Sequence, residues 1–182
     1  VALDEQTDAA RRERLTFIMN LGEILQRAGE LDEAEQVHRD GLKGRAEYYG
    51  EDHPGYAFGL EPLAEVLLGQ KRYDDAKPFL TRCVEIFEAH QHPRLSAAVI
   101  LEASASKAIT PSAPALTRLQ GASSELLHEV VQGAIDKAGL AMDGHYDPAV
   151  WLALLGELRQ VMVDGGWTDA HSLTHVVAAC SN

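Results

Sequence analysis

The sequence contains few cysteines, few aromatic residues and few positive charges. Its two cysteines, Cys83 and Cys180, lie far apart and belong to no CxxC or cysteine-histidine motif. A disulfide framework is therefore not expected, and both thiols are predicted to be free and buried in a protein of a reducing compartment. The expected location is the cytoplasm.

Long apolar runs are also missing. The most apolar window, residues 151–163, is interrupted by a glycine and three polar residues, so no stretch reaches the roughly 18 apolar residues of a membrane helix. Lys and Arg total 16 against 28 Asp and Glu, which gives a net charge of −12 at pH 7 without any basic cluster. We therefore expect a protein that binds neither nucleic acid nor a membrane surface.

Motifs of catalysis and of metal binding are absent as well. The chain has no GxSxG, no HExxH and no glycine-rich phosphate loop, and acidic pairs such as Asp74-Asp75 are explained by helix starts. His171 and His175 lie four residues apart on a predicted helix, but no third ligand lies at helical spacing. The prediction is a protein that is not an enzyme and has no catalytic residues, metal or cofactor.

Two segments of the first half repeat one pattern at a spacing of 42 residues. The matching pairs are Leu21 with Leu63, Leu25 with Leu67, Leu31 with Tyr73, Asp32 with Asp74, and Ala34 with Ala76. Such self-similarity is typical of repeat proteins, in which each unit is one supersecondary motif. Apolar residues make up 46% of the chain, which is enough for a core shared between neighbouring units.

One unit of this pattern is predicted to be a helical hairpin. Gly29 is expected to end the first helix in the left-handed conformation, and Asp32 is expected to cap the second. Gly50 and Pro54 then end one hairpin and begin the next. His53 and His92 are interpreted as linker residues that cap or pack at the hairpin junction. The apolar face of the first helix, at the i, i+3, i+4 spacing of a packed helix, consists of Phe17, Ile18, Leu21, Ile24, Leu25 and Ala28.

The pattern continues more weakly toward the C-terminus. Residues 123–142 are predicted to form an amphipathic helix, and Gly121 either breaks or kinks the helical segment before it. The expected organisation is a repeat region 1–106, with hairpins at about 8–49 and 54–90 and a third beginning at 94, followed by a divergent helical region 107–182 with a degenerate hairpin at about 147–180.

The linker Tyr49-Gly50-Glu51-Asp52-His53-Pro54, together with Leu21-Gly22, Gly29 and Ala34, resembles the tetratricopeptide repeat in its long-period form, named after kinesin light chain. The resemblance is closest over residues 15–95. It implies an all-α fold in which antiparallel helix-turn-helix hairpins stack as a right-handed superhelical solenoid. In such a solenoid each unit contacts only its neighbours, so a broad inner surface stays open for a partner.

The resemblance also implies where a ligand binds, namely on the concave wall formed by the first helix of each hairpin. The corresponding positions here are Thr16, Met19, Asn20, Glu23, Arg27, Phe58, Glu61, Pro62, Glu65 and Leu68. Relatives that clamp an acidic peptide tail place Lys and Asn four residues apart on this wall, whereas this chain has Thr16 and Asn20. The expected partner is therefore a protein or peptide that is basic or mixed in charge and carries an apolar anchor.

Other interpretations stay open. Phe58 suits the core and a ligand-stacking role equally well. The chain could instead act in a structural or oligomerisation role, as a homo-oligomer, or as a small-molecule sensor. In the structural case, an apolar stripe near the C-terminus would face a second copy, through Leu152, Leu155, Leu158, Val161, Val176 and Val177.

Overall fold

The computed structural model describes residues 2–105, 113–142, 148–166 and 170–181, and these residues are helical without any strand. The chain forms two compact units, residues 1–92 and 93–182. The predicted division between residues 106 and 107 lies outside the described residues. Each unit is described separately below.

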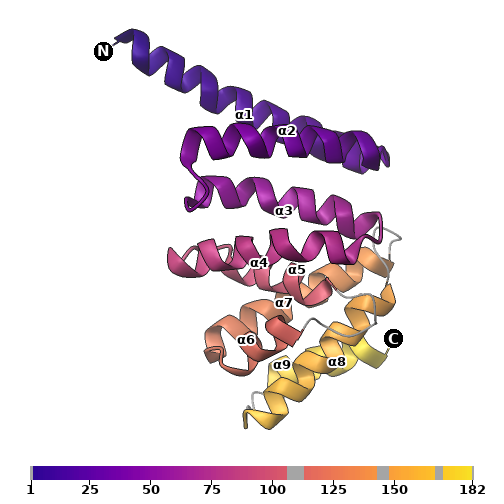
Figure 1. Cartoon of the computed structure of the whole chain (residues 1–182). Helices are drawn as coiled ribbons and strands as arrows, with labels where there is room; N and C mark the ends of the chain where they lie inside the picture. The colour runs from indigo at the N-terminus through magenta and orange to yellow at the C-terminus, as the bar shows by residue number, and fades with distance from the viewer. Residues whose placement is uncertain (1, 106–112, 143–147, 167–169, 182) are drawn as a thin grey trace. The chain divides into compact units, whose positions relative to one another are not determined.

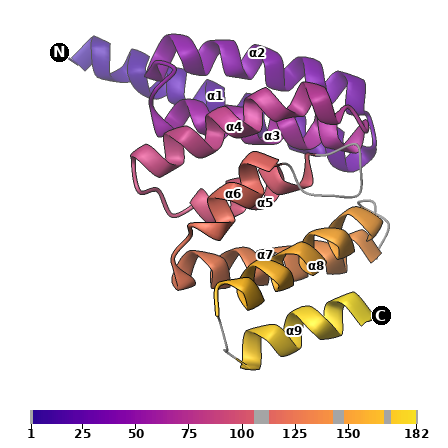
Figure 2. The ribbon, with the colours of Figure 1, turned by 60° about the horizontal axis from the view of Figure 1, so that its bottom comes forward.

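Unit 1 consists of four helices in which each packs against the next along the chain (Figures 1 and 2). Short turns join α1 to α2 and α3 to α4, so the helices form two antiparallel hairpins. The bounds of the helices are Ala2–Ala28 for α1, Leu31–Tyr49 for α2, Pro54–Gly69 for α3 and Tyr73–Ala89 for α4.

The ends of these helices follow the sequence signals at glycine and proline. Gly29 and Gly50 have φ values of +83° and +82°, which confirms the predicted helix ends. Pro54 is the first residue of α3, where no backbone donor is needed. His53 caps this helix, because its Nδ1 accepts a hydrogen bond of 2.9 Å from the backbone N–H of Gly55.

The predicted cap at Asp32 is wrong. Helix α2 begins one residue earlier, at Leu31, and the preceding Glu30 makes no capping bond with its side chain. The turn before it is closed by a backbone bond of 3.0 Å from Glu30 N to Leu25 O, and Asp32 lies inside the first turn of α2. There its carboxylate accepts a hydrogen bond of 3.0 Å from Gln70 Nε2 and so ties the two hairpins together.

Small residues bring the helices of each hairpin close together. Ala34 and Ala76, which match across the repeat, are fully buried. A Cβ atom at Gly41 or Gly44 of α2 would come within 2.9 Å of a side-chain carbon of Ile18 or Leu15 on α1. The glycines therefore allow α1 and α2 to approach more closely than larger residues would permit.

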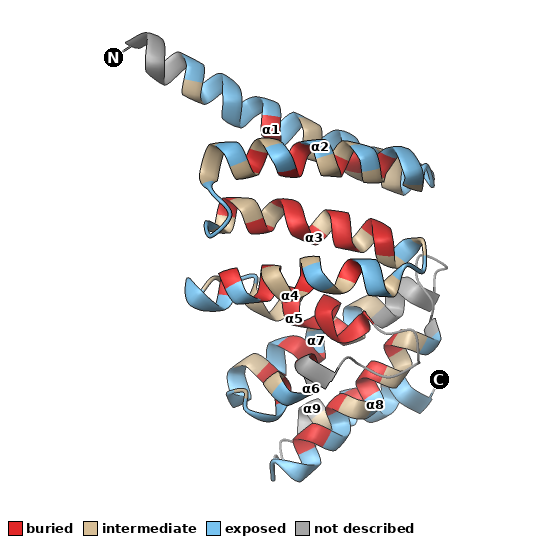
Figure 3. Ribbon diagram, in the orientation of Figure 1, coloured by how far each residue is buried: buried red, intermediate tan, exposed pale blue. Residues whose placement is uncertain are grey.

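The apolar face predicted for α1 is only partly a core face. Phe17, Leu21 and Ile24 are 67%, 39% and 63% exposed, whereas Leu15 and Gly22 of the same helix are buried (Figure 3). The prediction of a helix was right, but the prediction that this stripe is buried was wrong. The reason is that α2 covers one side of α1, and the stripe lies on another.

Unit 2 consists of five helices among its described residues. They are α5 (Leu95–Ser104), α6 (Ala113–Gln120), α7 (Ser124–Met142), α8 (Pro148–Asp164) and α9 (Ala170–Ser181). Helix α7 packs against α5, α8 and α9, and α8 packs against α9. Gly121 separates α6 from α7, and Ser123 Oγ accepts a hydrogen bond of 3.3 Å from Leu126 N at the start of α7.

The C-terminal apolar stripe mostly faces the interior. Leu155, Leu158, Val161 and Val176 are buried, and Val177 is 43% exposed. The stripe is therefore not the free surface that pairing with a second copy through these helices would require.

The two cysteines differ in exposure. Cys83 is free and buried, as predicted, but Cys180 is exposed, contrary to the prediction, because it lies near the end of α9. None of the described helices combines the length and apolarity of a bilayer-spanning segment.

Candidate binding surface

The predicted inner wall lies on α1 and α3 of unit 1. Of its residues, Thr16, Asn20 and Arg27 are exposed, whereas Glu61 is only 5% exposed. The other positions are partly exposed, namely Met19, Glu23, Phe58, Pro62, Glu65 and Leu68. The wall therefore presents one short polar row on α1 and a mixed acidic and apolar row on α3.

The polar row on α1 is available for hydrogen bonding. Asn20 makes no side-chain hydrogen bond with a described residue, so both its donor and its acceptor face solvent. Thr16 Oγ1 donates to the backbone oxygen of Arg12 at 3.1 Å, and Arg27 reaches Glu23 only at 4.0 Å. Asn20 is thus the amide of this row that can bond to the backbone of a ligand.

Phe58 belongs to an aromatic cluster. Its ring centroid lies 5.6 Å from that of Phe87 and 5.3 Å from that of His92, both in edge-to-face arrangements. His92 in turn stacks on Phe87 at 4.6 Å. Because Phe58 is only half-buried, the ring combines packing with an accessible surface, and His92 has the packing role predicted for it.

Two buried polar side chains of α2 lie behind the wall. Arg45 donates from Nη1 to the backbone oxygen of Gly55 at 2.7 Å, and its Nη2 lies 3.5 Å from Met19 Sδ. His38 is 3% exposed, and within the described part of the chain its Nε2 has no hydrogen-bond partner. Burial lowers the pKa of both His38 and Arg45, because it disfavours the charged forms.

The sequence analysis missed this buried pair, although glycines marked its place. A Cβ atom at Gly22 of α1 would overlap the imidazole ring of His38. A Cβ at Gly59 of α3 would lie 2.8 Å from Arg45 Cδ. Glycines inside two predicted helices, at positions that face α2, were thus the signal that bulky side chains of α2 occupy the space.

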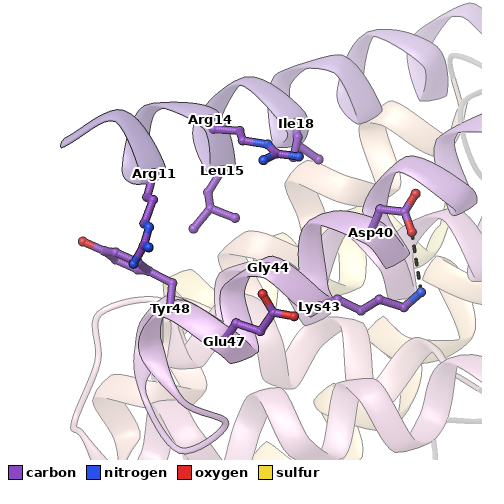
Figure 4. A pocket seen from close by; sticks show the side chains of 9 residues that line it. All are labelled: Arg11, Arg14, Leu15, Ile18, Asp40, Lys43, Gly44, Glu47 and Tyr48. Carbon is purple, nitrogen blue, oxygen red and sulfur yellow. Dashed lines mark ion pairs between the residues drawn. The ribbon is translucent and has the colours of Figure 1, made fainter. Parts of the chain in front are cut away.

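Figure 4 shows a hollow between α1 and α2 that was not predicted either. Its volume is about 430 Å³, and Leu15 points into it from α1. Arg11 and Arg14 make no ion pair with a described residue, while Lys43 pairs with Asp40 at 3.7 Å. Because α1 contributes two arginines and α2 contributes two acids and one lysine, the rim carries both signs of charge, and charge selects no single class of ligand. The lining residues are Arg11, Arg14, Leu15, Ile18, Asp40, Lys43, Gly44, Glu47 and Tyr48.

The histidines form no metal centre in the part of the chain that is described, where no group of three His, Cys, Asp or Glu side chains comes together. His175 is exposed, and the side chain of His171 lies outside the described residues. His90 Nδ1 lies 2.8 Å from the backbone oxygen of Ile86, one turn earlier in α4.

Comparison with known proteins shows which kind of repeat the first unit is similar to. The sequence model of the tetratricopeptide repeat matches residues 13–89, which span both hairpins of unit 1. Residues 13–89 therefore resemble tetratricopeptide repeats. The predicted resemblance is thereby confirmed for this segment, and tetratricopeptide repeats in general mediate contacts between proteins.

Solved structures agree with this assignment. The chain is similar to the crystal structure of a candidate kinesin light chain of Podosopora anserina with nearly identical TPR-like repeats. The identity is 19%, the TM-score is 0.51, and the match covers 91% of this chain and 94% of that one. A variant of the same protein matches at 18% identity, with the same TM-score and coverage. These likenesses confirm the predicted all-α solenoid fold. No curated protein matches the sequence.

Proposed function

We propose that the tetratricopeptide-repeat segment is a non-catalytic interaction module that binds a peptide or a partner helix on the inner wall of unit 1. The observation that carries this proposal is the combination of a free amide, Asn20, with partly exposed apolar and acidic side chains on the neighbouring helix α3. An amide can form hydrogen bonds with the backbone of an extended ligand, and the acidic and apolar residues of α3 can contact the ligand's side chains.

The charge of the wall favours a basic or mixed ligand. Glu23 and Glu65 are partly exposed on the wall, and Arg27 stands at its edge. Glu61 is too deeply buried to contribute more than a background negative potential. Leu68 and the accessible part of Phe58 would receive an apolar anchor, so the ligand we propose carries one apolar side chain near one or two cations.

The proposal assigns no chemical reaction to the described residues. Among them no group of three His, Cys, Asp or Glu side chains comes together. The location in the cytoplasm stays a prediction from the two unpaired cysteines. The proposal therefore concerns recognition alone.

The experiment is capture of partners by the purified chain from its own cell extract, with mass spectrometry as the readout. The wall variant is Asn20→Ala combined with Glu65→Gln, because both side chains are accessible and neither change creates a cavity in the core. The control variant is Glu85→Gln combined with Glu88→Gln, which alters exposed acids on the outer helix α4.

A partner that is recovered by the wild type and the control but lost with the wall variant would support the proposal and supply the ligand. A synthetic peptide from that partner should then bind about tenfold more weakly to the wall variant in fluorescence anisotropy. Equal recovery of every partner by the wall variant and the wild type would overturn the assignment of the inner wall.

A further inference from the structure

The strongest unexplained feature of unit 1 is an exposed apolar stripe on α1. Phe17, Leu21 and Ile24 follow one another at i, i+4 and i+7, so they form a continuous row along one face of the helix. Two of the three are more than 60% exposed. This face differs from the inner wall, which α1 forms through Thr16, Met19, Asn20, Glu23 and Arg27.

The repeat itself shows what covers such a face. The equivalent positions of α3, 42 residues later, are all buried. They are Gly59, Leu63 and Val66, which correspond to Phe17, Leu21 and Ile24. A Cβ at Gly59 would meet side-chain atoms of Leu42 and Arg45, so this face of α3 is turned toward α2. The equivalent face of α1 is therefore a helix-packing face without a helix on it in the described chain.

The α1 face has a different shape from the α3 face. Where α3 has Gly55 and Gly59, which give room to the Tyr49 ring and to Arg45, α1 has Glu13 and Phe17. A helix that packed on α1 as closely as α2 packs on α3 would collide with the Phe17 ring. The stripe thus needs an occupant with room for an aromatic ring.

We propose that the occupant is a second copy of the chain, which docks through an antiparallel contact between the two α1 helices about a twofold axis near Leu21. Phe17 and Ile24 lie four residues before and three residues after Leu21, at similar distances from that axis. In the pair, Phe17 therefore lies against Ile24 of the partner subunit, and the same contact forms twice by symmetry.

Charge complementarity supports the antiparallel direction. Glu13 and Arg27 are 14 residues apart, which is close to four turns of about 3.6 residues, so both lie along the same edge of the stripe. An antiparallel pair brings Glu13 near Arg27 of the partner subunit, again twice. A parallel pair would place Glu13 against the same carboxylate of its partner, which is unfavourable.

Neither of these charges is strongly engaged within the chain. Glu13 makes no ion pair with a described residue, and the guanidinium of Arg27 is 82% exposed, with Glu23 4.0 Å away. Arg27 lies where the stripe borders the inner wall, but Phe17, Leu21 and Ile24 lie outside that wall. The dimer proposal therefore rests on different apolar side chains from the ligand proposal, although the two surfaces share the edge of α1 that carries Asn20 and Arg27.

The test is the mass of the full chain by analytical ultracentrifugation from the low micromolar range to the submillimolar range. A single helix-helix contact is at the small end of interfaces, so we expect a monomer-dimer equilibrium in the micromolar range. Ile24→Glu should abolish the dimer, whereas Val177→Glu, which places the same charge on an exposed valine of α9, should leave it unchanged. Circular dichroism checks that both variants stay helical.

A charge exchange tests the direction of the pair. Glu13→Arg and Arg27→Glu should each weaken the dimer about three- to tenfold, and the double exchange should restore it to within about twofold. A wild-type chain that stays monomeric, a dimer that survives Ile24→Glu, or a double exchange that fails to restore the dimer would each overturn the proposal. Ile24→Glu changes no residue of the inner wall, so capture of partners by this variant tests the ligand site separately from the dimer. Arg27→Glu changes a wall residue and is used for the dimer alone.

Discussion

The first hairpin of unit 1 encloses polar side chains between its helices, whereas the interface between α3 and α4 is built from apolar ones. His38 and Arg45 are buried beside α1 and α3 and are accommodated by glycines. In the second hairpin the equivalent residues, 42 positions later, are Leu80 and Phe87, both fully buried. The comparison teaches that the 42-residue spacing determines where the helices lie. The side chains packed between them can be either polar or apolar.

The largest expected loss of stability comes from a substitution in the apolar second hairpin. Phe87→Ala removes a fully buried ring that contacts Phe58 and His92, so it should lower the free energy of unfolding by about 3–5 kcal/mol in urea denaturation. A loss below about 1 kcal/mol would show that the aromatic cluster does not hold the second hairpin together.

The next effect concerns the fit of His38 beside α1. Gly22→Ala adds a methyl group that overlaps the imidazole ring, so despite the better helix propensity of alanine we expect a net loss of about 1–2 kcal/mol. The matched control is Gly156→Ala inside α8, where a Cβ has open space around it. That change should stabilise the protein by about 0.5–1 kcal/mol.

A smaller change in stability is expected from the residue with positive φ in the turn of the second hairpin. Lys71 stands 42 residues after Gly29, and both have positive φ, +60° and +83°. A side chain in this conformation is strained, so Lys71→Gly should raise the free energy of unfolding by about 0.5–1 kcal/mol. A loss of stability on this change would mean that the lysine side chain stabilises the turn by more than the strain costs.

The buried histidine should also make the first hairpin sensitive to mild acid. Burial lowers the pKa of His38 in the folded protein, so the unfolded chain binds a proton at higher pH than the folded one does. Stability is therefore complete above about pH 6.5 and is lost as the pH falls below it. Thermal unfolding at pH 7.5 and pH 5.5 should show this loss for the wild type and a smaller one for His38→Gln.

The smallest effect concerns the ion pair between the hairpins. Arg72 Nη1 lies 2.7 Å from Glu35 Oε2, and Arg39 also bonds to this carboxylate at 2.7 Å. Burial opposes the ionisation of Glu35, but the two guanidinium groups outweigh it and lower its pKa. Arg72→Met should reduce the melting temperature slightly at low salt and have no effect near 1 M salt, because salt screens exposed charges.

Much of the fold of unit 1 could be predicted from the sequence, because its signals are local. Helix ends at Gly29 and Gly50 and the start at Pro54 follow from backbone conformations that these residues favour. The burial of Ala34 and Ala76 follows from their equivalent places in the repeat. These features need no knowledge of what lies across from them.

The features that were missed depend on neighbours. Periodicity shows that Phe17, Leu21 and Ile24 share one face of α1, but it does not tell whether another helix covers that face. Likewise, His38 is polar by composition and becomes buried only because Gly22 admits its ring. The positions of the inner wall were predicted from the resemblance to a known repeat. The burial of Glu61 could not be predicted in this way, because it depends on how α3 packs.

The joint between the two hairpins has a consequence for recognition. Tyr49 stacks on His53 at 5.2 Å, His53 caps α3, and the ring of Pro54 fixes its own backbone. These contacts restrain the linker, so we expect the rows of side chains on α1 and α3 to keep their spacing in the absence of a ligand. A ligand that bridges the two rows would therefore meet a preorganised surface, and little of its binding free energy would be spent on ordering the protein.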